Sequence, residues 1–437
     1  MTLLDHPQAQ TLLADAVLAP PDVAACAAQL HQFVQRYLPC FTRAEQRRHA
    51  QIILQGKLTD LQRKTTEPIA HRGGHQRRPL QLFVGAGGWQ DQAVLEELQT
   101  HVAEELGDDE GVFILDPSTF PKKGTASCGV ARQWCGRLGK LDNCQAGVFL
   151  AYAAPRGFAL VDARLYLPED WAADRTRRGA TYVPAEVVFQ EKWRIALDLL
   201  DGARRRLRGR WVVGDDEMGR CTELRGLLRL RKLKYVLDVP CNTLVRELSE
   251  RRPAGGRSRL PAFERVAEWL ERQPAGRWRQ VTVRDGEKGP LRVKVLLARV
   301  QTKDEDGRVG ARERLVVIRS VEAKPQTWYT LSNDREASRG RLAGVHGSRH
   351  RIEELLEQGK GEVGLGHYEV RSWTGWHHHM TLSLVALWFL QVEKLRLGKK
   401  NTGGDRGAGA VDLHGVVAAS AAECGSHRGG DQPHLAA

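Results

Sequence analysis

The sequence lacks paired cysteines and long apolar runs, and each absence excludes a class of protein. Its eight cysteines include no Cys-x-x-Cys pair, so neither a zinc site of the usual short spacing nor a disulfide framework is expected. We find no secretory signal and expect reduced thiols in the cytosol. The longest apolar stretch, Met380 to Val392, is interrupted by polar residues and is too short to span a bilayer.

A complete dinucleotide-binding glycine pattern is also missing. The segment from residue 79 to 89, PLQLFVGAGGW, resembles a strand followed by a dinucleotide loop, but Gln90 stands where the third glycine would be. We therefore predict a turn after this segment and no nucleotide site.

Positive charge is in excess. The net charge of +13 and the pI near 9.5 indicate a polyanionic partner, nucleic acid before membrane. Two segments concentrate this charge: Arg204, Arg205, Arg206, Arg208 and Arg210, then Arg225, Arg229, Arg231, Lys232 and Lys234. Either segment alone can be a solvated helix face; the global excess and the carboxylates described next favour contact with DNA.

The order of predicted elements indicates an α/β fold. Three strand-like runs begin at residue 111 and are followed by a helix, a strand (WVVGDD), a helix and a strand (YVLDVP). This is the order of a ribonuclease H-like core, a mixed five-stranded sheet flanked by helices. At 437 residues the chain is long for one core, and two or three domains are expected.

Composition and periodicity divide the chain further. We predict an N-terminal extension (1–19), a helical N-terminal domain (20–95), the first part of the core (96–245), a β-rich insertion (246–330), the closing helices of the core (331–397) and a disordered tail (398–437). The insertion contains alternating strand patterns with Asp-Gly turns, and the closing helices are expected from Arg349 to Gly359 and from Trp373 to Leu397.

Three carboxylates indicate a divalent-metal site that acts on phosphates. Asp116 and Asp216 end two apolar strand-like runs, and Glu353 lies far downstream on a predicted helix. Oxygen ligands hold Mg²⁺ or Mn²⁺, and such ions polarise the attacking and leaving oxygens of an in-line displacement. Asp215 precedes Asp216, so the doublet leaves the second ligand ambiguous.

Basic residues accompany these carboxylates. Arg349 precedes Glu353 by four residues and Lys360 follows it by seven. Arg349 is expected either to form an i,i+4 pair with Glu353 or to contact DNA phosphate. Lys122 and Lys123 follow Asp116 in a short loop, as phosphate contacts or as a solvated turn.

Four stretches give the chain a resemblance to bacterial insertion-sequence transposases of the DDE endonuclease superfamily. They are LDPSTFPKKG (115–124), GVARQWCGRLGKLDNCQAGVFL (129–150), GDDEMGR (214–220) and RIEELLEQGKGEVGLGHYEVRSWTGWHHH (351–379). The resemblance covers roughly residues 20 to 397. It implies a triad of Asp116, Asp216 and Glu353 that binds two Mg²⁺ ions, with Mn²⁺ as a substitute. Asp216 is favoured over Asp215 because the family-like Asp-Glu-x-Gly pattern begins there.

The related signature in such enzymes is Tyr, two residues, Arg, three residues, Glu, six residues, Lys. Here Arg349, Glu353 and Lys360 fit it, and His346 occupies the Tyr position.

The resemblance also implies an activity and partners. The expected protein binds element terminal inverted repeats through residues 20–95, cleaves them, and joins the 3′-hydroxyl ends to target DNA. It would work as a homodimer or higher oligomer on double-stranded DNA in the bacterial cytosol, associated with the nucleoid and not with a membrane. Arg204, Arg205 and Arg206 are further DNA-contact candidates. Two alternatives remain: a catalytically silent DNA-binding relative, and a metal-dependent phosphohydrolase of small molecules.

Overall fold

The computed structural model of the protein describes residues 20–136, 138–248, 260–286 and 289–398. The predicted extension (1–19) and residues 399–437 of the predicted tail lie outside this range. Within the described residues no helix is both long enough and apolar enough to cross a membrane.

Helices make up most of the described chain before residue 107. They are α2 (Pro20–Tyr37), the short 3₁₀ turn Leu38–Cys40, α3 (Ala44–Lys57), α4 (Thr66–Arg72), α5 (Arg77–Ala86) and α6 (Asp91–Leu106). The strand-like interpretation of residues 79–89 is wrong, because α5 covers most of them. Its residues Leu80, Phe83 and Val84 repeat at helical spacing and are buried.

These helices share one hydrophobic core with the sheet and with the last described helix, α15 (Trp373–Gly398). Leu30 and Leu98 belong to the same buried cluster as Phe113 and Leu390. The middle of α15 is buried on all sides, because the N-terminal helices cover one side of it and strands cover another. The predicted domain boundary between residues 95 and 96 falls inside α6. The N-terminal helices therefore share a hydrophobic core with the sheet and do not form a core of their own.

The strands form one twelve-stranded mixed sheet among the described residues. Its main path runs β2-β3-β1-β5-β6-β12-β11-β10-β7-β8, with β4 paired to β3 and β9 paired to β10. The strands are β1 (Val112–Pro121), β2 (Ala131–Cys135), β3 (Lys140–Ala154), β4 (Gly157–Leu165), β5 (Trp211–Gly214), β6 (Lys234–Asp238), β7 (Leu244–Glu247), β8 (Glu264–Arg265), β9 (Arg279–Gly286), β10 (Gly289–Lys303), β11 (Val309–Ser320) and β12 (Thr327–Ser332). Strands β1, β5 and β6 are parallel to one another, and the other pairs are antiparallel.

Helices connect or cover these strands. Between β4 and β6 lie α7 (Glu169–Ala173), α8 (Arg175–Ala180), α9 (Lys192–Ala203), α10 (Asp216–Gly219) and α11 (Thr222–Leu230). Further on come α12 (Val266–Glu271), the 3₁₀ turn Ala275–Arg277, α13 (Arg339–Gly347) and α14 (His350–Glu362). The predictions of helices at 349–359 and 373–397 are confirmed by α14 and α15.

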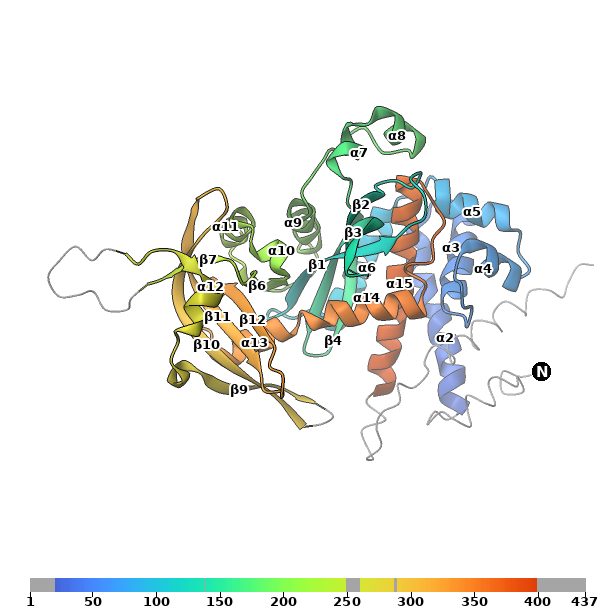
Figure 1. The fold of residues 1–437 in the computed structure, drawn as a ribbon. Helices are drawn as coiled ribbons and strands as arrows, with labels where there is room; N and C mark the ends of the chain where they lie inside the picture. Colours follow the sequence, from blue (N-terminus) through green and yellow to red (C-terminus); the bar gives the residue numbers. More distant parts are fainter. Residues whose placement is uncertain (1–19, 137, 249–259, 287–288, 399–437) are drawn as a thin grey trace, which may run out of the picture.

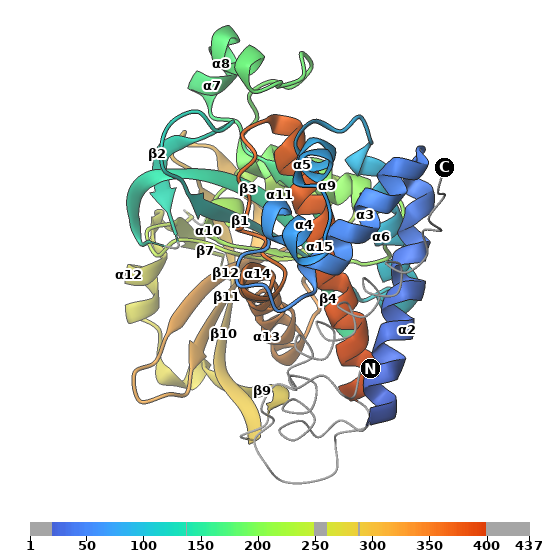
Figure 2. The same cartoon turned by 90° about the vertical axis from the view of Figure 1, so that its right-hand side faces the viewer.

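The β-rich insertion is part of the sheet rather than a separate module, which corrects the prediction. Strand β12 pairs with β6, with Leu331 opposite Leu237, and β11 and β10 follow. The predicted limits at residues 246 and 330 fall inside β7 and β12. A second buried cluster, which includes Trp269, Leu296 and Val317, lies in this part. Figure 1 shows the N-terminal helices and strands β9–β11 at opposite ends of the molecule, and Figure 2 shows α15 among the N-terminal helices.

Candidate active site

Three aspartates occupy one row across the three parallel strands. Leu115 of β1 pairs with Gly214 of β5, and Gly214 pairs with Leu237 of β6. The next residue in each strand direction is an aspartate: Asp116, Asp215 and Asp238. Because parallel strands in register place equivalent side chains in one row, the three carboxylates lie at the C-terminal ends of β5 and β6 and in the middle of β1, which continues to Pro121.

Asp215, and not the predicted Asp216, lies beside Asp116. Asp215 caps the N-terminus of α10 and accepts a hydrogen bond from the backbone N–H of Met218 at 3.1 Å. Asp216 is the first residue of α10, is half-exposed, and pairs with Arg220 one helical turn later at 3.5 Å. The chain turns into the helix between the two aspartates, so their side chains point in different directions.

Glu353 and Arg349 come from the start of α14, which packs against β1. The Arg349 Nη1 donates to Glu353 Oε1 at 3.0 Å, and His350 Nδ1 lies 3.2 Å from the other oxygen of Glu353. Of the two alternatives left open by the sequence for Arg349, the i,i+4 pair with Glu353 is present. Arg349 Nε also lies 3.6 Å from Asp238 Oδ2, so this guanidinium joins the helix to the aspartate row.

Asp238 is a site residue that the sequence interpretation missed, and its neighbour is His346, which the sequence interpretation had noted only as the residue in the Tyr position of the signature. His346 Nε2 lies 3.0 Å from Asp238 Oδ1, close enough for an ion pair but not aligned as a hydrogen bond. The signal for Asp238 was present, because the apolar run Tyr235 to Leu237 ends on it just as other runs end on Asp116 and Asp215. His346, in the signature's Tyr position, thus contacts the third aspartate of the row.

The electrostatics of the row favour a cation. Burial raises the pKa of Asp116 to about 8, with further upward contributions from Asp215 and Glu353 that exceed the opposing charges of Arg349 and Lys360. Burial likewise raises the pKa of Asp215 to about 6. Burial alone would lower the pKa of Arg349, but the surrounding carboxylates outweigh it and raise that pKa. Arg349 is thus the positive charge at the centre of four carboxylates.

The predicted lysines near the site differ in their surroundings. Lys360 donates to Ser118 Oγ of β1 at 3.0 Å and lies 5.2 Å from the ring centre of Phe120, next to the aspartate row. Lys122 packs on Tyr368, with its Nζ 3.4 Å from the ring centre, and burial lowers its pKa to about 8. Lys123 is exposed.

Arg204, Arg205 and Arg206 do not belong to this site. They follow the end of α9 and precede β5, whose opposite end carries Asp215. Arg206 pairs with Glu96 of α6 at 2.6 Å, and Arg205 is exposed. These arginines therefore lie at the sheet edge opposite to the carboxylates.

Residues 36–290 match the family model described as DDE superfamily endonuclease. The chain belongs to this family. The match includes the three aspartates of the row and ends before Arg349 and Glu353. A search of curated proteins finds no match. Among solved structures, a piggyBac transposase synaptic complex with hairpin DNA has 10% sequence identity and a TM-score of 0.40, over 89% of this chain and 73% of that chain.

The carboxylate oxygens of the aspartate row are the type of ligand that divalent cations such as Mg²⁺ prefer. Asp116 and Asp215 are neighbouring carboxylates whose pKa values are raised, first by burial and then by nearby carboxylates, so a cation between them would favour their charged forms. In the described part of the chain, however, no group of three His, Cys, Asp or Glu side chains is close enough together to hold an ion. Glu353 is engaged with Arg349 and His350. Asp116 and Asp215 are therefore of the right chemical type to bind a divalent cation. Glu353, in this structure, contacts Arg349 and His350 and not the two aspartates.

Proposed function

We propose that this protein is a DNA transposase that cleaves element ends in a metal-dependent reaction and joins the 3′-hydroxyl ends to target DNA. The observation that carries the proposal is the aspartate row of Asp116, Asp215 and Asp238, faced by Arg349 and Glu353, in a chain of the DDE superfamily endonuclease family. The excess of positive charge supports a nucleic-acid substrate.

The proposed fold assignment is a ribonuclease H-like core with a sheet extension. Support comes from β4, β3, β1, β5 and β6, which follow one another in the sheet with the antiparallel and parallel pairs expected of such a core. Strands β12 to β7 extend this core on the β6 side.

In the proposed mechanism Asp116, Asp215 and Glu353 would hold two divalent ions, Mg²⁺ or Mn²⁺. Bound there, such ions polarise the attacking and leaving oxygens of a phosphodiester. Asp116, with a pKa near 8, retains a proton at neutral pH until positive charge arrives. Before a metal ion binds, Arg349 supplies positive charge beside the aspartate row. Once Glu353 no longer pairs with Arg349, the guanidinium is suited to pair with a phosphate.

The proposal also covers the remaining basic residues and the assembly. Lys360, anchored on Ser118, and the exposed Lys123 are suited to contact phosphates as point charges. We further propose that the protein acts on terminal inverted repeats as a homodimer or higher oligomer, with end binding by residues 20–95. A catalytically silent DNA-binding relative is the second candidate, because His346 occupies the Tyr position and Glu353 is held by Arg349.

The decisive experiment uses the DNA that flanks the gene. Flanking sequence is searched for inverted repeats, and labelled duplexes of those ends are incubated with the protein and Mg²⁺ or Mn²⁺. Cleavage by the wild type but not by Asp116→Asn supports the transposase. Binding without cleavage supports the silent relative, and the absence of both leaves a small-molecule hydrolase.

A further inference from the structure

A cavity of about 540 Å³ lies at the start of β6, between the end of α11, strand β11 and the segment after β12. Its lining is rich in cations: Arg229, Lys232, Lys234, Arg312 and Arg335. The described lining residues include no aromatic side chain on which a base would stack. A ligand recognised here is therefore recognised by negative charge.

Several of these cations have no anionic partner within the described residues. Lys234 pairs with Asp334, and Arg229 pairs with the buried Glu313 at 2.7 Å. The other three, Lys232, Arg312 and Arg335, are exposed and have no ion pair in the described part of the chain. Opposing them is one lining carboxylate without an ion pair, Glu336. The cavity thus keeps a net positive charge after its internal pairs are counted.

Lys232 occupies a position that usually belongs to glycine. It ends α11 with a left-handed φ of 59°, donating its backbone N–H to Arg229 O at 2.9 Å. A side chain with a β-carbon is strained in this conformation, which is why helices commonly end there on glycine. Lys232 thus places a long cationic side chain on the cavity wall in spite of a strained backbone, which points to a functional role for its ammonium group.

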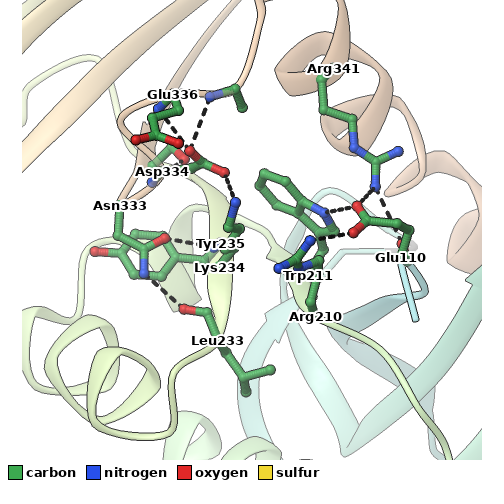
Figure 3. A network of polar contacts seen from close by, with 12 residues as sticks. Glu110, Arg210, Trp211, Leu233, Lys234, Tyr235, Asn333, Asp334, Glu336 and Arg341 are labelled. Carbon is green, nitrogen blue, oxygen red and sulfur yellow. Dashed lines mark hydrogen bonds and ion pairs between the residues drawn. The ribbon is translucent and has the colours of Figure 1, made fainter.

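The cavity wall is fixed by a polar network, which Figure 3 shows. The Asn333 side chain accepts from Tyr235 N at 2.9 Å and donates to Leu233 O at 2.8 Å, which extends the β6–β12 pairing past the end of β12. Asp334 accepts from the backbone N–H groups of Glu336 and Ala337 while it pairs with Lys234. The cationic groups are therefore presented from a rigid support.

A second cationic group adjoins the cavity through Trp211. The Lys234 ammonium lies 5.4 Å from one Trp211 ring centre, and the Arg341 guanidinium lies 5.3 Å from it. Arg341 and Arg210 share a single carboxylate, Glu110, at 2.6 and 2.5 Å. Two further arginines, Arg341 and Arg210, therefore lie near the cavity at the start of β5.

This surface is separate from the aspartate row. Lys234 and Asp238 stand at opposite ends of β6, so about 13 Å of strand separates them at roughly 3.3 Å per residue. A phosphate held in the cavity is not the one cleaved at Asp116.

We propose that the cavity binds backbone phosphates of duplex DNA, at a distance from the phosphate that is cut. The inference rests on the proposed function for DNA as the partner, while the phosphate site itself rests on Lys232, Arg312 and Arg335. A free nucleotide would supply the same phosphate chemistry, but the absence of an aromatic side chain from the described lining favours the DNA backbone.

The test measures DNA affinity against salt for the full chain carrying Lys232→Gln, Arg312→Gln and Arg335→Gln. The matched control is Arg156→Gln, Lys294→Gln and Lys324→Gln, three exposed cations outside the cavity that also lack an ion pair among the described residues. Each phosphate contact contributes about −0.9 to the slope of log affinity against log salt. The cavity variant should lose about two to three units of slope and the control at most one. Equal slopes in the two variants would overturn the proposal.

Two further measurements separate the alternatives. Lys232→Gly should weaken DNA binding while the melting temperature stays the same or rises, because glycine relieves the strain; a purely structural role for Lys232 would leave DNA binding unchanged. ATP is the probe for a free-nucleotide site. The proposal would also be overturned if millimolar ATP raised the melting temperature of the wild type but not of the triple variant, while the two proteins had the same slope of log DNA affinity against log salt. Failure of the wild type to cleave end DNA would contradict the proposed function. The salt dependence of DNA affinity, compared between the cavity variant and the control variant, would still test the phosphate site.

Discussion

Asp116 and Asp215 lie side by side because Leu115 and Gly214 pair in the parallel register of β1 and β5. Asp238 takes the third place in this row through the pairing of Gly214 with Leu237. Asp216 is one residue further on and belongs to α10, where it pairs with Arg220. Strand register therefore selects which member of the Asp215–Asp216 doublet faces the site.

The first prediction distinguishes the two members of that doublet. Asp116→Asn and Asp215→Asn should each lower metal-dependent end cleavage by more than about 100-fold, beyond the loss typical of outer-shell partners. Asp216→Asn should lower it by less than about 10-fold, because that carboxylate faces Arg220 and solvent. All three variants should still bind end DNA. Cleavage rates are compared in single-turnover assays, and a more severe defect in Asp216→Asn than in Asp215→Asn would contradict the assignment.

The second prediction concerns Arg349, the cation among the carboxylates. Arg349→Gln leaves Asp116, Asp215 and Asp238 without their shared counter-charge, so stability without metal should fall by about 2 kcal/mol, less than for a fully buried pair because Glu353 is partly exposed. Millimolar Mg²⁺ should restore much of that loss. Arg351→Gln, on the same helix and paired with Glu354, is the control and should change little. Thermal melts with and without Mg²⁺ make the comparison, and equal melting temperatures for the two variants would remove Arg349 from this role.

The sequence predicted those parts of the fold that depend on local patterns. Apolar runs that end in aspartate identified β1 and β5, and helical periodicity identified α14 and α15. What it missed depends on long-range pairing. No local feature reveals that β12 pairs with β6, or that α15 needs the N-terminal helices as cover. The direction of Asp216 follows from the turn into α10, and the remote position of Arg204 to Arg206 follows from the direction of β5.

The third prediction follows from the continuous sheet. Replacement of residues 246–330 by a short Gly/Ser linker removes most of β12, exposes the edge of β6 and uncovers Leu237, which is fully buried. An exposed apolar strand edge is an aggregation site, so this deletion variant should be insoluble or aggregate on purification. Size-exclusion chromatography gives the answer. A monodisperse variant with an intact melting transition would show that the β-rich part is dispensable for the core.

Lys57 is the last residue of α3 and is buried beside His379 of α15, where burial disfavours its charged form. Its ammonium has no hydrogen-bond partner in the described part of the chain and lines a small cavity with Lys64 and His379. Burial, reinforced by the charge of Lys64, lowers the pKa of Lys57 to about 7 from 10.5.

The last prediction is the dependence of stability on pH that this lysine causes. Between pH 7 and 10.5 the unfolded chain holds the Lys57 proton and the folded chain does not, so this group makes the free energy of unfolding rise with pH across that window. One proton gives a slope of up to about 1.4 kcal/mol per pH unit. Lys57→Met should raise stability at pH 7 and flatten the curve above it, whereas Lys324→Met, at an exposed position, should leave the curve unchanged. Denaturant unfolding at pH 7, 8 and 9 makes the comparison. A Lys57→Met curve with the wild-type slope would mean that Lys57 keeps its proton in the folded protein, through contacts to water or an anion in the cavity.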